Sequence, residues 1–136
     1  MIIEINNKTR SNISEKTVRK VVEKFLEKNR KTGKEVSIVF VGDKAIRRIN
    51  KEFRGKDKVT DVLSFEGEEN FLGEILIDYA QIRRQAKKFG NSAKDELVFI
   101  LVHGLLHLIG HEDETEKGRK KMERLGEDFI KRNPEI

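Results

Sequence analysis

The chain contains no cysteine and no tryptophan, and its single proline, Pro134, lies near the C-terminus. The lack of cysteine excludes disulfide bonds, thiolate metal sites and cysteine nucleophiles, so any metal must be held by histidine and carboxylate ligands. No run approaches the roughly 20 apolar residues that a membrane-spanning helix requires. The first residues, Met1-Ile2-Ile3-Glu4, lack the basic flank and apolar stretch of a signal peptide. We therefore expect a cytoplasmic protein with no membrane partner.

Charged residues are abundant, at 39% of the 136 residues against 36% for hydrophobic ones. Lysine and arginine number 29 and aspartate and glutamate 24, which gives a net charge of +5. A basic excess favours anionic partners, among them nucleic acid, although both signs are mixed along the chain. The length fits one domain with its own core, and no linker or repeat interrupts it. Residues 1–136 are therefore expected to form one domain.

Apolar residues recur along the chain with two different spacings, one typical of strands and the other typical of helices. Strands are expected at 1–5, 35–41, 62–65 and 71–77, and helices at 17–29, from 43, at 79–89, from 93 to about 109 and from about 115 to 131. The third and fourth strands are expected to form a hairpin. The spacing places Phe53 on one face of the second helix with Ala45, Ile46 and Ile49. It predicts that Phe89 points inward on the third helix, together with Ile82 and Ala86. The pattern indicates an α+β domain, with a mixed sheet of about four strands covered by about five helices.

All three histidines, His103, His107 and His111, lie within nine residues. His103 and His107 are four residues apart, so on a helix they project from one face and can bind one divalent ion. The pair alone is a weak signal, because core helices without a metal carry the same spacing. Gly104 stands where zinc proteases of the H-E-x-x-H type have their catalytic glutamate, so the chemistry must differ. A glycine inside a helix costs about 1 kcal/mol relative to alanine, which indicates close approach of another group.

A third metal ligand is expected just beyond this helix. Gly110 can turn the chain sharply, and two carboxylates, Glu112 and Asp113, follow it. Asp113 lies ten residues after His103, a spacing that lets a loop complete a three-ligand site, and we prefer it. His111 is the alternative, because neutral imidazole binds zinc well. Three protein ligands leave one position for water, as in a catalytic rather than a structural zinc site.

Two long segments carry motifs of a known family. Residues 50–65 resemble N-x-x-(F/Y)-R-G-x-D-x-x-T-D-V-L-S-F, and residues 103–113 resemble H-G-x-L-H-L-x-G-Y-D-H, the signatures of the YbeY-type endoribonucleases or rRNA maturation factors. Residues 72–75 and 85–86 fall in matching order, so the resemblance spans about residues 40–113. It implies a mixed sheet with covering helices and one bound Zn²⁺. It also implies single-strand-specific cleavage of RNA in 16S rRNA 3′-end maturation and ribosome quality control.

The resemblance also implies roles for particular residues in the metal site. His103 and His107 match the family's first two metal ligands, and His103 is also expected to take part in catalysis. The family's third ligand is a histidine, and Asp113 stands at that position, so the chain departs from the family in the ligand itself. Aspartate can bind zinc through oxygen, and its charge would weaken the Lewis acidity of the ion. His111 and Glu112 stand at the family's tyrosine and aspartate positions.

The resemblance further indicates how RNA is bound. Arg54 matches the family's functionally important arginine, and a guanidinium group binds two phosphate oxygens at once. Without the match, Arg54 would be interpreted as a surface cation at the end of a helix. Lys51, Lys56 and Lys58 are expected to contact the RNA backbone. The expected partners are rRNA and ribosomal components, and the oligomeric state is left open.

Two alternatives from other classes remain. One is a zinc hydrolase such as a protease, against which Gly104 argues. The other is a ribosome- or RNA-binding factor without enzymatic activity, in which the metal only stabilises the fold. For the expected cleavage reaction, the general base is left open among Glu112, His111 and a water on the metal.

Overall fold

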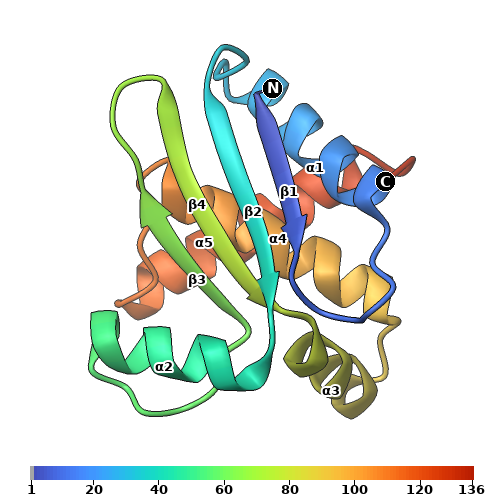
Figure 1. Ribbon diagram of the computed structural model, residues 1–136. Coiled ribbons are helices and arrows are strands. Elements are labelled where there is room, and N and C mark those ends of the chain that lie inside the picture. The colour runs from blue at the N-terminus through green and yellow to red at the C-terminus, as the bar shows by residue number, and fades with distance from the viewer. Residues whose placement is uncertain (1) are drawn as a thin grey trace.

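Four strands form one mixed sheet, in the order β1-β2-β4-β3. The structure is a computed structural model and describes residues 2–136 (Figure 1). The strands are β1 (Ile3–Asn7), β2 (Glu35–Val41), β3 (Val62–Glu66) and β4 (Phe71–Asp78), and the helices are α1 (Glu15–Lys28), α2 (Asp43–Arg54), α3 (Tyr79–Phe89), α4 (Ala93–Leu108) and α5 (Glu116–Lys131). The predicted α+β class, with about four strands and five helices, is confirmed.

The sheet is parallel over three strands and antiparallel at one edge. β1 pairs with β2 and β2 with β4 in parallel, whereas β3 pairs with β4 in the antiparallel direction. The turn between β3 and β4 closes the hairpin that the sequence predicts. β1 and β3 are therefore the two edge strands, and each leaves one row of backbone groups without a neighbouring strand.

The sheet is covered by helices on both faces. Alternate side chains of β2 enter two cores: Val36, Ile38 and Phe40 lie in the larger one, and Val39 and Val41 in the smaller one. α1, α4 and α5 cover the face of the larger core, while α2 packs on the opposite face through Ile46 (Figure 1). α4 is central, because most of its residues are buried and it contacts α1, α3, α5 and the sheet.

Most predicted elements agree with the structure to within one or two residues, but two phenylalanines at helix ends are exposed, and one of them is predicted from the sequence to point inward. Phe53 is 62% exposed and Phe89 is 63% exposed. Phe53 lies in the last turn of α2, at the β3 edge of the sheet, where its ring packs only edge-on against Phe65. Phe89 is the last residue of α3. The prediction that Phe89 points inward is wrong, because helical spacing does not show where the covered surface ends.

Among residues 2–136, no helix is both long and apolar enough to cross a bilayer.

Candidate active site

A cleft of about 830 Å³ lies beside the free edge of β3. One wall is formed by the end of α2 and the loop that follows it, and the other by α4, the segment after α4, and α5. β3 itself lines the cleft along residues 62–66. Segments far apart in the sequence therefore meet here, and they include both motifs singled out from the sequence.

α4 carries the histidine pair into this cleft. His103 and His107 are partly buried, and their rings lie 4.8 Å apart between centroids. Gly104, between them, lies against the sheet: a Cβ there would be 3.1 Å from Cγ2 of Ile75 and 3.2 Å from Oγ of Ser64. Ser64 Oγ donates a hydrogen bond to the Gly104 carbonyl at 3.2 Å. The close approach expected at Gly104 is thus present, and it sets the depth of the histidines above β3.

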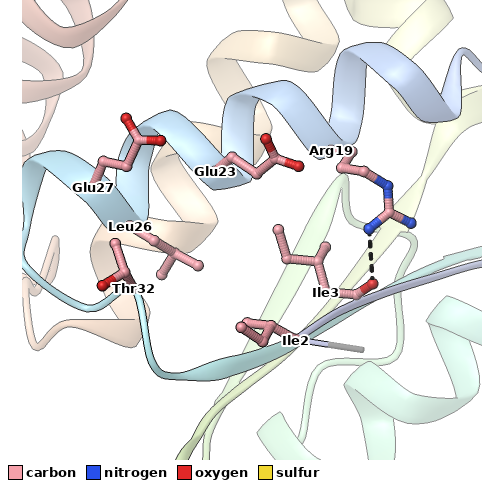
Figure 2. Close-up of a pocket in the computed structure, with 7 residues that line it drawn as sticks. All are labelled: Ile2, Ile3, Arg19, Glu23, Leu26, Glu27 and Thr32. Carbon is pink, nitrogen blue, oxygen red and sulfur yellow. Dashed lines mark hydrogen bonds between the residues drawn. The ribbon is translucent and has the colours of Figure 1, made fainter.

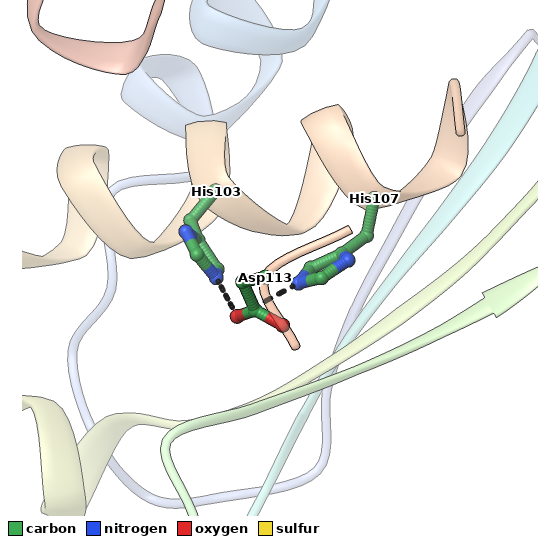
Figure 3. Close-up of side chains that lie close together, drawn as sticks. All are labelled: His103, His107 and Asp113. Atoms are coloured by element: carbon green, nitrogen blue, oxygen red, sulfur yellow. Dashed lines mark hydrogen bonds and ion pairs between the residues drawn. The ribbon is translucent and has the colours of Figure 1, made fainter. Parts of the chain in front are cut away.

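Asp113 reaches the same point from the segment after α4. Gly110 has a φ of 100°, and the chain turns back there over the end of the helix. The Asp113 Oδ2 atom lies 3.2 Å from His103 Nε2 and 3.4 Å from His107 Nε2 (Figure 3). One ligand atom from each of the three residues falls within 4.8 Å of the others. The structure therefore brings together the three residues that the sequence analysis prefers.

The donor set fits a divalent cation. Ligand atoms around a tetrahedral zinc, with bonds of about 2.0–2.1 Å, are about 3.3 Å apart, close to the two nitrogen–oxygen distances observed. The carbonyl of His111 lies 2.9 Å from His107 Nδ1 and can only accept, so Nδ1 carries the hydrogen and Nε2 keeps its lone pair. Burial acts to raise the pKa of Asp113, but His107 and His103 outweigh it and hold the pKa below its usual range. The carboxylate is therefore ionised, as a metal ligand must be.

His111 takes a different position from the one considered as an alternative. Its side chain is not part of the group of ligand atoms, and only its backbone carbonyl contributes, through the hydrogen bond to His107. Burial, together with Lys121 and His107, lowers the pKa of His111. Glu112 lines the cleft beside Asp113. The geometry therefore favours Asp113 over His111 as the third ligand.

Cations form the opposite wall. Arg54, the last residue of α2, donates from Nη2 to the carbonyl of Ser64 at 3.1 Å, which fixes its guanidinium at the β3 edge. The following loop is held by the buried Asn50, which donates from Nδ2 to the carbonyl of Lys58 at 3.0 Å. Lys56 and Lys58 line the cleft together with Arg54, whereas Lys51 is not among the lining residues.

Several lining residues were not expected from the sequence. Arg119 and Glu123 reach the cleft from α5, and Phe99 reaches it from α4. Arg119 is exposed on an amphipathic helix, and no motif distinguishes it from the other surface cations there. Its place depends on how α5 packs back over α4, which is a tertiary feature. Carboxylates such as Glu112 and Glu114 lie on the histidine side, so the two walls differ in charge.

A second cavity, of about 470 Å³, lies between β1 and α1 (Figure 2). It is lined mainly by apolar atoms of Ile2, Ile3 and Leu26, with Glu23 and Glu27 on α1 above them. Arg19 donates from Nη1 to the carbonyl of Ile3 at 3.1 Å and so covers part of the β1 edge. No histidine lines this cavity, and the described residues show no group of possible metal ligands there. The candidate chemistry is confined to the cleft beside β3.

Fold and site together define a small α+β protein with a three-residue metal centre at one wall of an open cleft, an arrangement typical of metal-dependent hydrolases. The sequence model of the family described as Endoribonuclease YbeY matches residues 3–133. The chain belongs to the YbeY family.

Individual relatives agree with this assignment. The chain is 34% identical to "Endoribonuclease YbeY" of Sulfurovum sp. (strain NBC37-1), over 94% of this chain and 90% of the relative. It is 38% identical to the protein of that name from Sulfurihydrogenibium sp. (strain YO3AOP1), over 81% and 76%. The solution structure of TM1509 from Thermotoga maritima is similar, with a TM-score of 0.64 and 28% identity, over 96% of this chain and 90% of that one.

Proposed function

We propose that this protein is a metal-dependent endoribonuclease that cleaves single-stranded RNA, acts as one domain in the cytoplasm, and serves in 16S rRNA 3′-end maturation and ribosome quality control. One observation carries the proposal: His103, His107 and Asp113 converge on one point in the cleft that Arg54 faces from the other wall. Curated relatives bear the name Endoribonuclease YbeY, which supports RNA as the substrate. Ribosomal components are the proposed partners.

The metal site is proposed to hold one Zn²⁺ through His103 Nε2, His107 Nε2 and an Asp113 oxygen. Two nitrogens and one carboxylate oxygen form a donor set that zinc accepts in catalytic sites. A zinc ion bound there supplies Lewis-acid polarisation of a phosphoryl oxygen, or activates a water for attack. The Asp113 carboxylate puts one more negative charge on the site than a third histidine would. Zinc affinity and Lewis acidity therefore depend on this residue.

The protein's own groups position and neutralise the RNA phosphate. Arg54 has one NH₂ group on the Ser64 carbonyl, which leaves its other N–H groups to donate to phosphate oxygens. The charge that develops on the phosphate during cleavage is offset by this guanidinium. Lys56 and Lys58 extend the positive wall and bind neighbouring phosphates, and Arg119 adds one cation from α5 on the histidine side of the cleft. Lys51 is proposed to attract the RNA backbone at longer range, because its side chain does not line the cleft.

Proton transfer is assigned to the carboxylate side of the cleft. Glu112 lines the cleft next to Asp113, and burial lowers the pKa of His111, so a carboxylate and a neutral imidazole are the two candidate proton acceptors beside the metal ligands. All three ligand residues line the cleft, which favours an enzyme over a binding factor with a purely structural metal. The missing glutamate at Gly104 argues against a protease of the H-E-x-x-H type.

The test is metal content and RNA cleavage, measured on the same purified samples. Arg54→Ala is expected to retain zinc but to lose cleavage by about 10²–10³-fold, because it removes a group that acts on the developing charge. His107→Ala is expected to lose both zinc and cleavage. Arg48→Ala is the matched control, since Arg48 is an exposed arginine of α2 that does not line the cleft. Full activity in both the Arg54 and His107 variants would refute the assignment.

A further inference from the structure

An exposed aromatic ring lies next to the cation wall of the cleft. Phe53 precedes Arg54 in the last turn of α2 and is 62% exposed. Its ring meets that of Phe65 in an edge-to-face contact, with centroids 5.5 Å apart and an interplanar angle of 72°. Phe65 is partly buried, packs against the smaller core and lines the cleft. The Phe53 ring is therefore held in place by a neighbour that borders the candidate active site.

An exposed phenylalanine forgoes the stabilisation that burial would give it, and a ligand that covers the Phe53 ring recovers part of that stabilisation. Two other exposed phenylalanines differ in their surroundings. Phe89 lies on α3, away from the cleft lining, and its ring is covered in part by the Lys88 ammonium at 5.5 Å. Phe71 is only 39% exposed and does not line the cleft either. Phe53, in contrast, combines exposure with a ring contact to a residue that lines the cleft.

The neighbours of Phe53 indicate which ligand covers it. Arg54 follows it directly, and Lys56 and Lys58 line the same wall, so an anionic chain bound there passes the aromatic ring. Proteins bind single-stranded nucleic acid by this combination of backbone cations and exposed aromatic rings on which bases stack. A base in a duplex is already stacked and paired, so only an unpaired base can use such a ring.

We propose that Phe53, held by Phe65, is a stacking site for one unpaired nucleobase of the RNA whose phosphate is bound at Arg54. The inference rests on the proposed function, because it assumes that RNA enters this cleft. It extends that function by naming how single strands are selected. The stacked base fixes the position of the adjoining phosphate relative to Arg54, so loss of the ring weakens binding and lowers kcat/KM together.

The experiment compares three variants of the full, zinc-loaded chain on a short single-stranded RNA. Phe53→Leu removes the aromatic face but keeps an apolar side chain, and is expected to lower affinity and kcat/KM by about 5- to 150-fold. Phe53→Tyr keeps the ring and is expected to stay within about twofold of the unaltered protein. Phe89→Leu removes an equally exposed phenylalanine outside the cleft, and is expected to change nothing. Zinc content and melting temperature are measured in parallel, and both are expected to be unchanged.

A second arm locates the base. The RNA is altered by an abasic nucleotide at one position at a time. At one position, the abasic RNA is expected to bind the unaltered protein as weakly as the intact RNA binds Phe53→Leu. The same abasic RNA is expected to bind Phe53→Leu no more weakly than intact RNA does, because the two changes remove one interaction.

The outcomes separate the two proposals. If the unaltered protein cleaves the RNA but Phe53→Leu binds and cleaves equally well, the stacking site is wrong and the proposed function stands. It is also possible to compare the abasic RNAs between the two proteins. If every abasic position that weakens binding to the unaltered protein weakens binding to Phe53→Leu as well, the ring contacts something other than a base, and the inference is likewise overturned. If the unaltered zinc-loaded protein does not cleave RNA at all, both proposals fail.

Discussion

The two walls of the cleft are built in different ways. The histidine wall belongs to α4, a helix buried on most of its surface and pressed against the sheet at Gly104. Its polar contacts are short and local: Asp113 lies within 3.4 Å of both histidine Nε2 atoms, and a backbone carbonyl orients His107. A site of this kind has one geometry, because its side chains are fixed by the core behind them.

The cation wall lies at the end of α2, beyond the smaller core. Its charges are carried by long side chains on an exposed turn, and Arg54 and Asn50 provide its anchors through backbone carbonyls. Long cationic side chains adapt to a flexible phosphate chain, and they act mainly through screened electrostatics. Changes at the histidine wall should therefore abolish function, whereas loss of a single lysine at the cation wall should reduce RNA binding by degrees.

The largest expected effect is at the third proposed ligand. Asp113→Ala is expected to lower zinc affinity by more than about 100-fold and cleavage to background, since loss of even an outer-shell partner costs about 10–100-fold. His111→Ala is the matched control for zinc affinity alone, because its ring is not in the ligand group and only its backbone carbonyl contacts His107. Metal analysis after dialysis measures both. Zinc retained by Asp113→Ala but lost by His111→Ala would reverse the assignment of the third ligand.

The second-largest expected effect is on the free energy of unfolding. It comes from Asp78, which lies near the start of α2, the helix whose other end carries the cation wall. Asp78 is fully buried, and its Oδ2 atom lacks a hydrogen-bond partner among the described residues. Burial, and the nearby Asp43 at the start of α2, raise the pKa of Asp78 to about 7. Asp43 stays ionised, because its hydrogen bond to Arg84 lowers its pKa. Between about pH 4 and 7 the folded protein therefore keeps a proton on Asp78 that the unfolded chain releases.

The free energy of unfolding is consequently expected to fall as pH rises through this window, by at most about 1.4 kcal/mol per pH unit, and to level off above pH 7. Asp78→Asn keeps an acceptor for the start of α3 but cannot titrate, so this slope should disappear. Asp57→Asn is the control, since the hydrogen bond from Arg47 lowers the pKa of Asp57 and its titration lies below the window. Urea unfolding at several pH values measures the slope. An unchanged slope in Asp78→Asn would show that another group causes it.

A third prediction tests whether the histidine wall depends on backbone packing as well as on ligands. Gly118, in the first turn of α5, lies against the segment that carries Asp113, and a Cβ there would run into the backbone carbonyl of Glu112. Gly118→Ala is therefore expected to displace that segment and to lower zinc affinity by about 10–100-fold, as loss of other supporting contacts does. Isothermal titration with zinc measures this.

A second glycine of α5 provides the control for that change. A Cβ on Gly126 would make an ordinary contact, 3.7 Å from Val102 Cγ1. Gly126→Ala is expected to leave zinc affinity unchanged and to raise stability by up to about 1 kcal/mol through helix propensity. Equal zinc affinity in both variants would mean that the position of Asp113 does not depend on α5.

The two walls also differ in how far the sequence predicts them. The metal group lies within eleven residues and depends on one helical turn and one bend, so spacing predicts His103 and His107 and favours Asp113 over His111 as the third ligand. The same holds for α3, whose range follows from Asp78 before it and Gly90 after it. These features are local, and local chemistry decides them.

Features that depend on tertiary packing were missed. The order β1-β2-β4-β3 joins strands from both halves of the chain, and no spacing encodes it. Arg119 reaches the cleft only because α5 folds back across α4. Phe53 has the spacing of a core residue, yet α2 ends beyond the surface that would bury it. The sequence predicts which face of a helix is apolar, but it does not predict at which residue that face stops packing against the rest of the protein.

The smallest expected effect is at the rim of the cation wall. Lys56→Ala and Lys58→Ala each remove one charge that lines the cleft, and each is expected to reduce the slope of log affinity against log salt by about 0.7 if it binds one phosphate of a single strand. Zinc content should not change. Lys51→Ala provides the comparison within the same helix and loop, because Lys51 lies outside the lining and should change the slope less. Binding titrations at several salt concentrations measure all three. Equal slopes for all three variants would show that net charge, and not position in the cleft, governs RNA binding at this wall. In that case only the histidine wall would depend on the position of particular side chains.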